Sequence, residues 1–160
     1  MQPMDEKVSR RRISLILGSL AAVPAHAQSK QAEMAIHQEI DFKTAPARIY
    51  ATLLDAKQFS AFTKDAAEIE PQPGAAFKLF GGRIEGRNVE LSPNQRIVQA
   101  WRPASWPAGV YSIVRFELVA RASGTRIVLD HAGFPEDKRE GLSEGWPVNY
   151  WAPLHKYLNA

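Results

Sequence analysis

Histidine and cysteine are the first residue types to consider for chemistry, because they bind metals, exchange protons and act as nucleophiles. The 160-residue chain contains no cysteine, which excludes thiolate ligands, thiolate nucleophiles and disulfides. Beyond residue 27 its histidines are His37, His131 and His155, which lie far apart and lack the spacing of a metal site. No Gly-x-Ser-x-Gly motif indicates a hydrolase nucleophile. The sequence therefore predicts no metal, no cofactor and no catalytic residue.

His131 is the polar residue best placed to contact a ligand. It falls at the end of a predicted strand, on the face that it shares with Ile127 and Leu129. A neutral imidazole there offers one donor and one acceptor. Two alternatives remain open: a structural histidine that caps the following helix or binds a loop carbonyl, and a general base that works with Asp130 or Glu85. Strand alternation places Asp130 on the opposite face, which weakens that pairing.

Aromatic residues supply the rest of a candidate site, because small-molecule pockets are lined largely by aromatic and apolar side chains. Aromatic side chains with this periodicity also fill hydrophobic cores, and we expect both roles here. Phe116 is expected in the core. The predicted ligand-binding residues are Phe62, Phe80, Trp101, His131, Trp146, Tyr150 and Trp151. The predicted partner is a small apolar ligand.

Hydrophobic periodicity predicts the elements that position these residues. Residues 36–42 alternate apolar and polar side chains, which is typical of a half-buried strand. Pro46 can begin a helix with Thr44 as its cap, and a second short helix follows. Residues 77–131 then form a series of predicted strands separated by turns rich in Gly, Pro, Asn and Ser.

The last segment, residues 136–158, is predicted to be helical. Apolar side chains recur there every fourth residue, at Leu142, Trp146, Tyr150, Leu154 and Leu158. Pro147 and Pro153 lie inside this segment, and each removes an N–H donor and crowds the preceding turn. We therefore expect a broken or bent terminal helix rather than a straight one.

The order of these elements resembles the α+β helix-grip fold of the START/polyketide-cyclase (SRPBCC) superfamily. The likeness is closer to its activator-of-heat-shock-protein-90-ATPase-like family. It rests on residues 46–50, 82–86, 93–101, 116–118, 124–126, 131–135 and 145–146. The resemblance implies a curved antiparallel sheet that wraps around a long C-terminal helix and encloses a cavity.

The resemblance also supplies the functional hypotheses, because members of the superfamily bind lipids, hormones, polyketides or aromatic compounds. The leading hypothesis is a periplasmic protein that binds a small hydrophobic or aromatic ligand in the cavity between sheet and helix. The second is a protein-interaction module that regulates a chaperone ATPase, although predicted export argues against it because that chaperone and its ATP are cytosolic. The third is a cyclase- or hydrolase-type enzyme that uses the same cavity.

Residues 1–27 have the three-part layout of a secretory signal peptide. A basic block that includes Arg10 and Arg11 precedes a mainly apolar run over residues 13–23, which is too short to span a membrane. Ala25 and Ala27 fit the small-x-small cleavage pattern. The basic block resembles a twin-arginine signal; a general secretory signal and an uncleaved amphipathic anchor are the alternatives.

This leader implies a periplasmic or secreted location and the export machinery as a partner. After cleavage at residue 27 we expect a flexible lead-in over residues 28–35 and one domain over residues 36–160, with no stable membrane span. The formal net charge of +3 falls to +1 without the leader, with 16 basic and 15 acidic residues left. No basic cluster remains in that part of the sequence, so nucleic-acid binding is not predicted.

Overall fold

The computed structural model describes residues 34–159, and the predicted leader and its cleavage site lie outside the described residues. The strands are β1 (Ala35–Phe42), β2 (Glu68–Ile69), β3 (Ala76–Leu79), β4 (Ile84–Ser92), β5 (Arg96–Pro103), β6 (Ser112–Arg121) and β7 (Gly124–Ala132). The α-helices are α2 (Pro46–Leu54), α3 (Ala56–Thr63), α4 (Arg139–Trp146) and α5 (Ala152–Leu158). Short 3-10 helices occupy Phe80–Gly82 and Glu136–Lys138.

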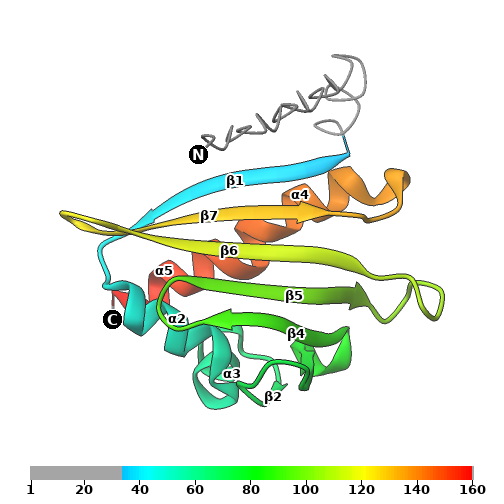
Figure 1. The fold of residues 1–160 in the computed structure, drawn as a ribbon, viewed down its shortest axis with the longest axis horizontal. Helices are drawn as coiled ribbons and strands as arrows, with labels where there is room; N and C mark the ends of the chain where they lie inside the picture. The colour runs from blue at the N-terminus through cyan, green and yellow to red at the C-terminus, as the bar shows by residue number, and fades with distance from the viewer. Residues whose placement is uncertain (1–33, 160) are drawn as a thin grey trace, which may run out of the picture.

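The strands form one antiparallel sheet of seven strands in the order β1-β7-β6-β5-β4-β3-β2. The sheet is curved, and the terminal helix runs across one of its faces, with α2 and α3 beside the C-terminal end of that helix (Figure 1). This arrangement confirms the predicted α+β helix-grip fold. It also gives the sheet an inner face toward the helices and an outer face toward solvent.

Strand alternation separates these two faces cleanly on β6. Val114, Phe116 and Leu118 point inward and are buried in the core, as their spacing predicts. Arg115 points outward and pairs with Asp130 of β7, with 2.6 Å between Nη2 and Oδ2.

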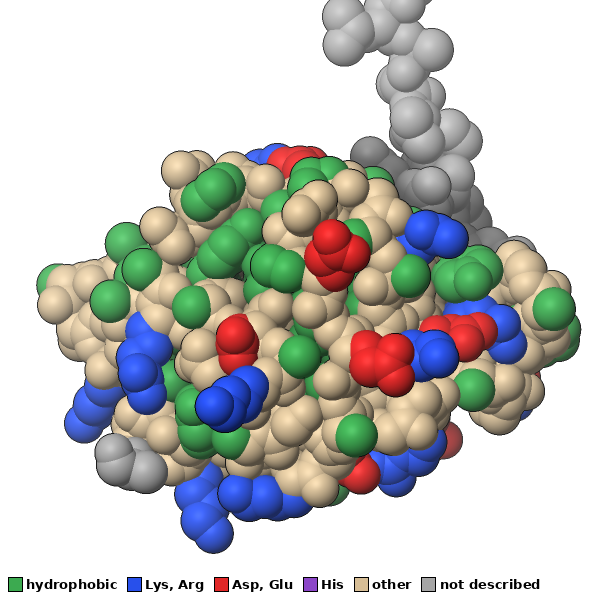
Figure 2. All heavy atoms as spheres, turned by 90° about the horizontal axis from the view of Figure 1, so that it is seen from below, with side chains coloured by type: hydrophobic (Ala, Val, Ile, Leu, Met, Phe, Trp, Pro, Cys, Tyr) green, Lys and Arg blue, Asp and Glu red, His purple; other side chains and the backbone are tan. Residues whose placement is uncertain are grey.

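Figure 2 shows a different surface, the edge of the molecule near β2, β4 and α3. Basic and acidic side chains are interspersed with apolar ones on this edge.

The start of α2 differs from the sequence-based expectation, because Thr44 does not cap the helix. The N-cap position is Ala45, which makes no side-chain cap hydrogen bond, and Pro46 follows it in the first turn. The carbonyl of Thr44 instead accepts a hydrogen bond from Thr125 Oγ1 at 2.6 Å. Gly124 allows this approach, because a Cβ at that position would lie 2.0 Å from the Phe42 carbonyl oxygen.

The terminal helix is not broken at its prolines, so the prediction of a broken helix is wrong. Between α4 and α5 a π-helical turn over Pro147–Trp151 keeps right-handed helical dihedrals on both sides, and Ala152 N–H donates to the Pro147 carbonyl. Pro147 cannot donate to the carbonyl of Ser143. The Nε2 of Gln38 in β1 donates to that carbonyl at 3.0 Å instead. The missing backbone bond is thus replaced by a contact between the sheet and the helix.

Gln38 holds the helix at a second point, because its Oε1 accepts a hydrogen bond of 2.7 Å from Trp151 Nε1. One amide therefore links β1 to both halves of the terminal helix. Among the described residues, no helix combines the length and the apolar character needed to cross a bilayer.

Candidate ligand-binding pocket

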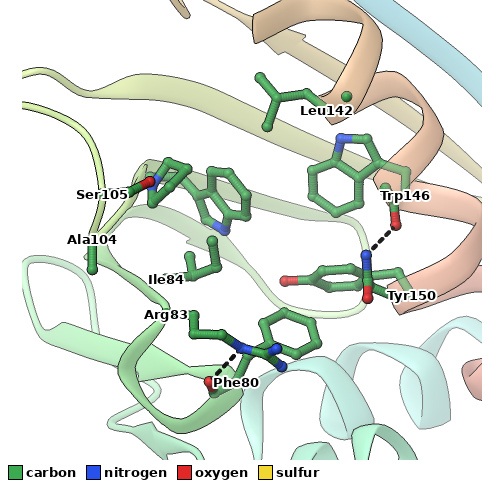
Figure 3. A pocket seen from close by; sticks show the side chains of 13 residues that line it. Phe80, Arg83, Ile84, Ala104, Ser105, Leu142, Trp146 and Tyr150 are labelled. Carbon is green, nitrogen blue, oxygen red and sulfur yellow. Dashed lines mark hydrogen bonds between the residues drawn. The ribbon is translucent and has the colours of Figure 1, made fainter.

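A pocket of about 470 Å³ opens between the sheet and the terminal helix. Its walls come from the turn after β3, the start of β4, the end of β5 with the loop that follows, and the inner side of α4 and the π turn (Figure 3). The lining residues are Phe80, Arg83, Ile84, Trp101, Pro103, Ala104, Ser105, Gly141, Leu142, Gly145, Trp146, Asn149 and Tyr150. The volume lies within the range of small-molecule sites.

The pocket brings together four of the seven predicted ligand-binding residues: Phe80, Trp101, Trp146 and Tyr150. The other three predicted residues lie in the core around it and do not line it. Phe62 packs between α3 and α5, with its ring 6.3 Å from that of Tyr157. Trp151 stacks behind Trp146 at 5.6 Å between ring centroids.

His131 is fully buried, and both of its ring nitrogens are engaged. Trp146 Nε1 can only donate, and it lies 3.3 Å from His131 Nδ1, so Nδ1 is the unprotonated acceptor. His131 Nε2–H then donates to Ser112 Oγ at 2.8 Å, and that hydroxyl donates to the Trp101 carbonyl at 2.8 Å. The chain of hydrogen bonds ties α4 to β5, β6 and β7 and fixes the indole of Trp146 in the pocket wall.

Burial lowers the pKa of His131 to about 4, so the imidazole is neutral at physiological pH. Its suggested catalytic partners are engaged elsewhere. Asp130 lies on the outer face, where it binds His37 at 2.7 Å and Arg115 at 2.6 Å. Glu85 pairs with Arg102 at 2.6 Å. The geometry therefore brings neither carboxylate to His131, and the imidazole acts as a structural link between sheet and helix.

Two polar groups lie close together in the pocket wall, the indole N–H of Trp101 and the hydroxyl of Tyr150. Trp101 is 5% exposed, and its Nε1–H approaches the Tyr150 hydroxyl without ideal hydrogen-bond geometry. The Tyr150 hydroxyl points across the pocket toward the side of Ile84 (Figure 3). Burial raises the pKa of Tyr150 well above its usual range, and the nearby Trp101 indole only partly offsets this effect, so the hydroxyl stays protonated. The pocket thus combines apolar walls with one donor and one hydroxyl.

The turn at the pocket entrance has an unusual backbone. Phe80, Gly81 and Gly82 all have positive φ, at 53°, 67° and 87°. Glycine adopts this region freely, whereas for Phe80 it costs about 1–2 kcal/mol. Arg83 holds the turn, because its Nε donates to the Phe80 carbonyl at 3.1 Å and its Nη2 binds Asp65 at 2.7 Å. The strained turn presents the Phe80 ring to the pocket.

Several lining residues were not predicted as site residues. Leu142 fits the core-facing pattern of the last helix, and Ile84 fits a strand pattern, so the sequence alone does not separate them from core residues. Ser105 belongs to a loop that carries no periodic signal. The Gly81–Gly82 pair does indicate a turn here, and Arg83 follows it directly.

The described residues contain no group of three His, Cys, Asp or Glu side chains arranged to hold a metal ion.

Comparison with known protein families identifies the family to which this chain belongs. The family model described as Activator of Hsp90 ATPase homolog 1-like protein matches residues 43–159, which is most of the sequence. The chain belongs to this family. The match agrees with the family resemblance read from the sequence.

Two members of the activator family illustrate the relationship. The chain is 34% identical over 110 residues to an activator of 90 kDa heat shock protein ATPase homolog of Dictyostelium discoideum, covering 68% of this chain and 29% of that protein. It is 30% identical over 125 residues to homolog 2 of Mus musculus, covering 78% of this chain and 38% of that protein. The chain therefore spans about a third of the length of these relatives.

The fold of the family is also seen in a crystal structure of an HSP90 activator from Plasmodium falciparum. It superposes with a TM-score of 0.74 at 23% identity, covering 79% of this chain and 96% of that one. At that identity the likeness shows the shared fold alone.

Proposed function

We propose that this domain binds a small hydrophobic or aromatic ligand in the pocket between the sheet and the terminal helix, and that it does so in the periplasm. The observation that carries the proposal is the pocket itself, which has mainly aromatic and apolar walls and a volume of about 470 Å³. Pockets of this size and lining are typical of small-molecule sites.

The rigidity of the pocket walls supports a binding role. The hydrogen bond from Trp146 to His131 fixes one wall, and the contacts of Arg83 fix the turn that presents Phe80. Binding to a preformed site requires little ordering of side chains, which preserves affinity. The periplasmic location rests on the signal-like leader in the sequence.

Filling the pocket from Gly141 tests the proposal. Gly141 lines the pocket, and a Cβ there would meet no heavy atom within 4 Å, so the position leaves room to begin a side chain. Gly141→Leu should abolish the binding of a fluorescent hydrophobic dye, while Gly141→Ala, which adds one methyl group to the same helix position, should retain it. Both variants should fold at least as well as the natural chain, because glycine inside a helix costs about 0.5–1 kcal/mol relative to alanine.

Thermal unfolding provides the second readout of this test. A ligand at a hundredfold excess over its dissociation constant adds about 2.7 kcal/mol to the stability of the folded state. A panel of apolar and aromatic compounds should therefore contain members that raise the melting temperature of the natural chain and of Gly141→Ala but not of Gly141→Leu. If no compound shifts the melting temperature and the dye does not bind, the ligand-binding proposal is wrong.

A protein-interaction role is the second candidate, and family membership favours it, because the relatives are named as activators of a chaperone ATPase. The outer face of β6 and the residue before it expose Tyr111, Ile113 and Val119 to solvent. Exposed apolar residues of this kind are common at protein interfaces. Adding the domain to a purified Hsp90-type ATPase should raise its ATP turnover if this candidate is correct, and an Ile113→Asp variant should not.

A further inference from the structure

The two edges of the sheet differ in how well they are protected against pairing with another chain. The edge strand β2 has two residues, and Pro71 and Pro73 follow it closely. Short strands and prolines are common protections of a sheet edge. The opposite edge strand, β1, has eight residues, pairs with β7 without a register shift and contains neither lysine nor proline (Figure 1). Among the described residues, β7 is the only strand that pairs with β1, so a further strand could pair on its open side.

Hydrogen bonds elsewhere in the sheet show which backbone groups of β1 face this open edge. Leu118 N–H donates to the Gln95 carbonyl at 2.8 Å, so the even-numbered residues of β6 bond to β5. Because bonding direction alternates along each strand, even-numbered residues of β7 bond to β6 and odd-numbered ones bond to even-numbered residues of β1. The Ala35 carbonyl agrees with this pattern, since it accepts a long hydrogen bond of 3.5 Å from Arg139 Nη2 of α4. The open edge therefore carries the N–H and C=O groups of His37, Glu39 and Asp41.

The side chains of these three residues lie on the outer face of the sheet and are paired with β7. His37 Nδ1 lies 2.7 Å from Asp130 Oδ1. Arg126 binds both Glu39 and Asp41 at 2.7 Å. The acidic charges of the edge strand are thus balanced within the molecule, and they give less protection against pairing than free charges would.

β1 is complementary to a second copy of itself in one antiparallel register. With Gln38 on a two-fold axis, His37 of each copy lies opposite Glu39 of the other on the outer face. On the inner face Ile36 lies opposite Ile40. Opposite charges and apolar side chains that face each other stabilise a strand pair. Registers centred on His37 or on Glu39 instead place that residue opposite itself, and like charges in this position are destabilising.

We propose that β1 is a dimer interface, at which two copies of this chain pair β1 with β1 about a two-fold axis through Gln38 and form one continuous sheet. His37 of one copy and Glu39 of the other then exchange both of their backbone hydrogen bonds. A contact of this kind uses the same surface on both copies, so it closes and does not propagate into a fibre. The interface does not depend on the pocket or on the proposed ligand.

Sedimentation equilibrium between about 10 μM and about 1 mM protein measures the association. The natural chain should form a reversible dimer within this range. Glu39→Pro removes an N–H that points to the open edge and none that bonds to β7, so it should raise the dissociation constant about tenfold or more. Glu39→Ala is the matched control, because it removes the same side chain but keeps the N–H, and it should weaken the dimer less. Ile113→Asp changes the outer face away from this edge and should leave the association unchanged.

Cysteine cross-linking tests the register, because the natural chain contains no cysteine. Directly opposite residues of a hydrogen-bonded pair have Cα atoms about 5.5 Å apart, which suits a disulfide, whereas diagonal neighbours are about 7–8 Å apart. Oxidation of a mixture of His37→Cys and Glu39→Cys proteins should therefore link the two variants to each other faster than either variant links to itself. This measurement carries the test if circular dichroism shows that Glu39→Pro does not fold.

Three results would overturn the inference. The natural chain could remain monomeric throughout the concentration range, which would leave the ligand-binding proposal standing. The dimer could survive Glu39→Pro in a folded protein, or be lost in Ile113→Asp, and the interface would then lie elsewhere. The mixed cysteine variants could cross-link no faster than the separate ones, which would exclude the register centred on Gln38.

Discussion

Replacing His131 with glutamine isolates the effect of one buried imidazole on the pH dependence of folding. In the native state Nδ1 accepts a hydrogen bond from Trp146 and Nε2 donates to Ser112, an arrangement that only the neutral ring can make. Protonation of Nδ1 would place a second donor against the indole N–H in a site with no solvent exposure. Glutamine retains a donor and an acceptor but does not titrate.

The magnitude follows from the pKa of His131, which burial lowers from 6.5 to about 4. Each unit by which the pKa differs between the folded and unfolded states corresponds to about 1.36 kcal/mol. The lowered pKa of His131 therefore corresponds to about 3 kcal/mol in the free energy of unfolding. Because the unfolded chain binds the proton more readily, this stability is fully present above about pH 6.5. It is lost progressively as the pH falls toward 4.

Urea unfolding of the natural chain and of His131→Gln, between about pH 7.5 and pH 4, measures the effect. Titrating carboxylates contribute equally to both proteins, so the difference between the two unfolding free energies reports His131. That difference should shrink by about 3 kcal/mol on acidification. His37→Gln is the matched control: the hydrogen bond with Asp130 raises the pKa of the exposed His37, so its contribution has the opposite sign and is lost as the pH rises.

A constant difference between the natural chain and His131→Gln across this range would refute the reasoning. It would mean that the folded protein accepts a proton on His131 as easily as the unfolded chain does. Nitrogen chemical shifts of the imidazole give an independent check, because they should identify the tautomer with the proton on Nε2 at neutral pH.

Three further predictions concern stability and export. Phe116→Ala should lower the free energy of unfolding by about 3–5 kcal/mol, because the ring is buried at the centre of β6; a loss below about 1 kcal/mol in urea unfolding would contradict this packing. Asn88→Ala should lower the free energy of unfolding by about 2–3 kcal/mol in the same assay. Asn88 is buried, its Oδ1 accepts a hydrogen bond from Gln99, and its Nδ2 donates to the Glu70 carbonyl. An unchanged stability would mean that water replaces the amide. Intact mass of the exported protein should show cleavage between residues 27 and 28, and lysines in place of Arg10 and Arg11 should block export if the twin-arginine route is used; a cytoplasmic chain that keeps its leader would contradict export.

The fold could be predicted because its signals are local. Alternation on β6 and β7 placed Val114, Phe116 and His131 on the inner face, and the structure confirms this face. Pro46 gave the start of α2 correctly, since a proline in the first turn loses no helical hydrogen bond. The cap at Thr44 was wrong because its surroundings are set by β7, which is distant in the sequence.

The site was harder to predict because it depends on pairings between distant segments. The role of His131 depends on Ser112 and Trp146, which approach it only through the register of β6 with β7 and the docking of α4. The closeness of the Trp101 indole to the Tyr150 hydroxyl depends on how the terminal helix docks on β5, and no sequence pattern records that. The left-handed conformation of Phe80 is likewise hidden, because the following glycines indicate a turn without giving its handedness.

The π turn makes the number of residues between α4 and α5 part of the design of the core. In an α-helix five residues advance about 500°, which would point Trp146 and Trp151 about 140° apart. The wider turn brings their rings to within 18° of parallel on the same side of the helix. Deleting one residue from this turn would leave the two tryptophans four residues apart, and ordinary α-helical winding would then point them only about 40° apart. Keeping every residue but winding the segment as an α-helix would instead rotate α5 by about 100° relative to α4 and take Leu154 out of the core, so the extra residue and the wider turn depend on each other.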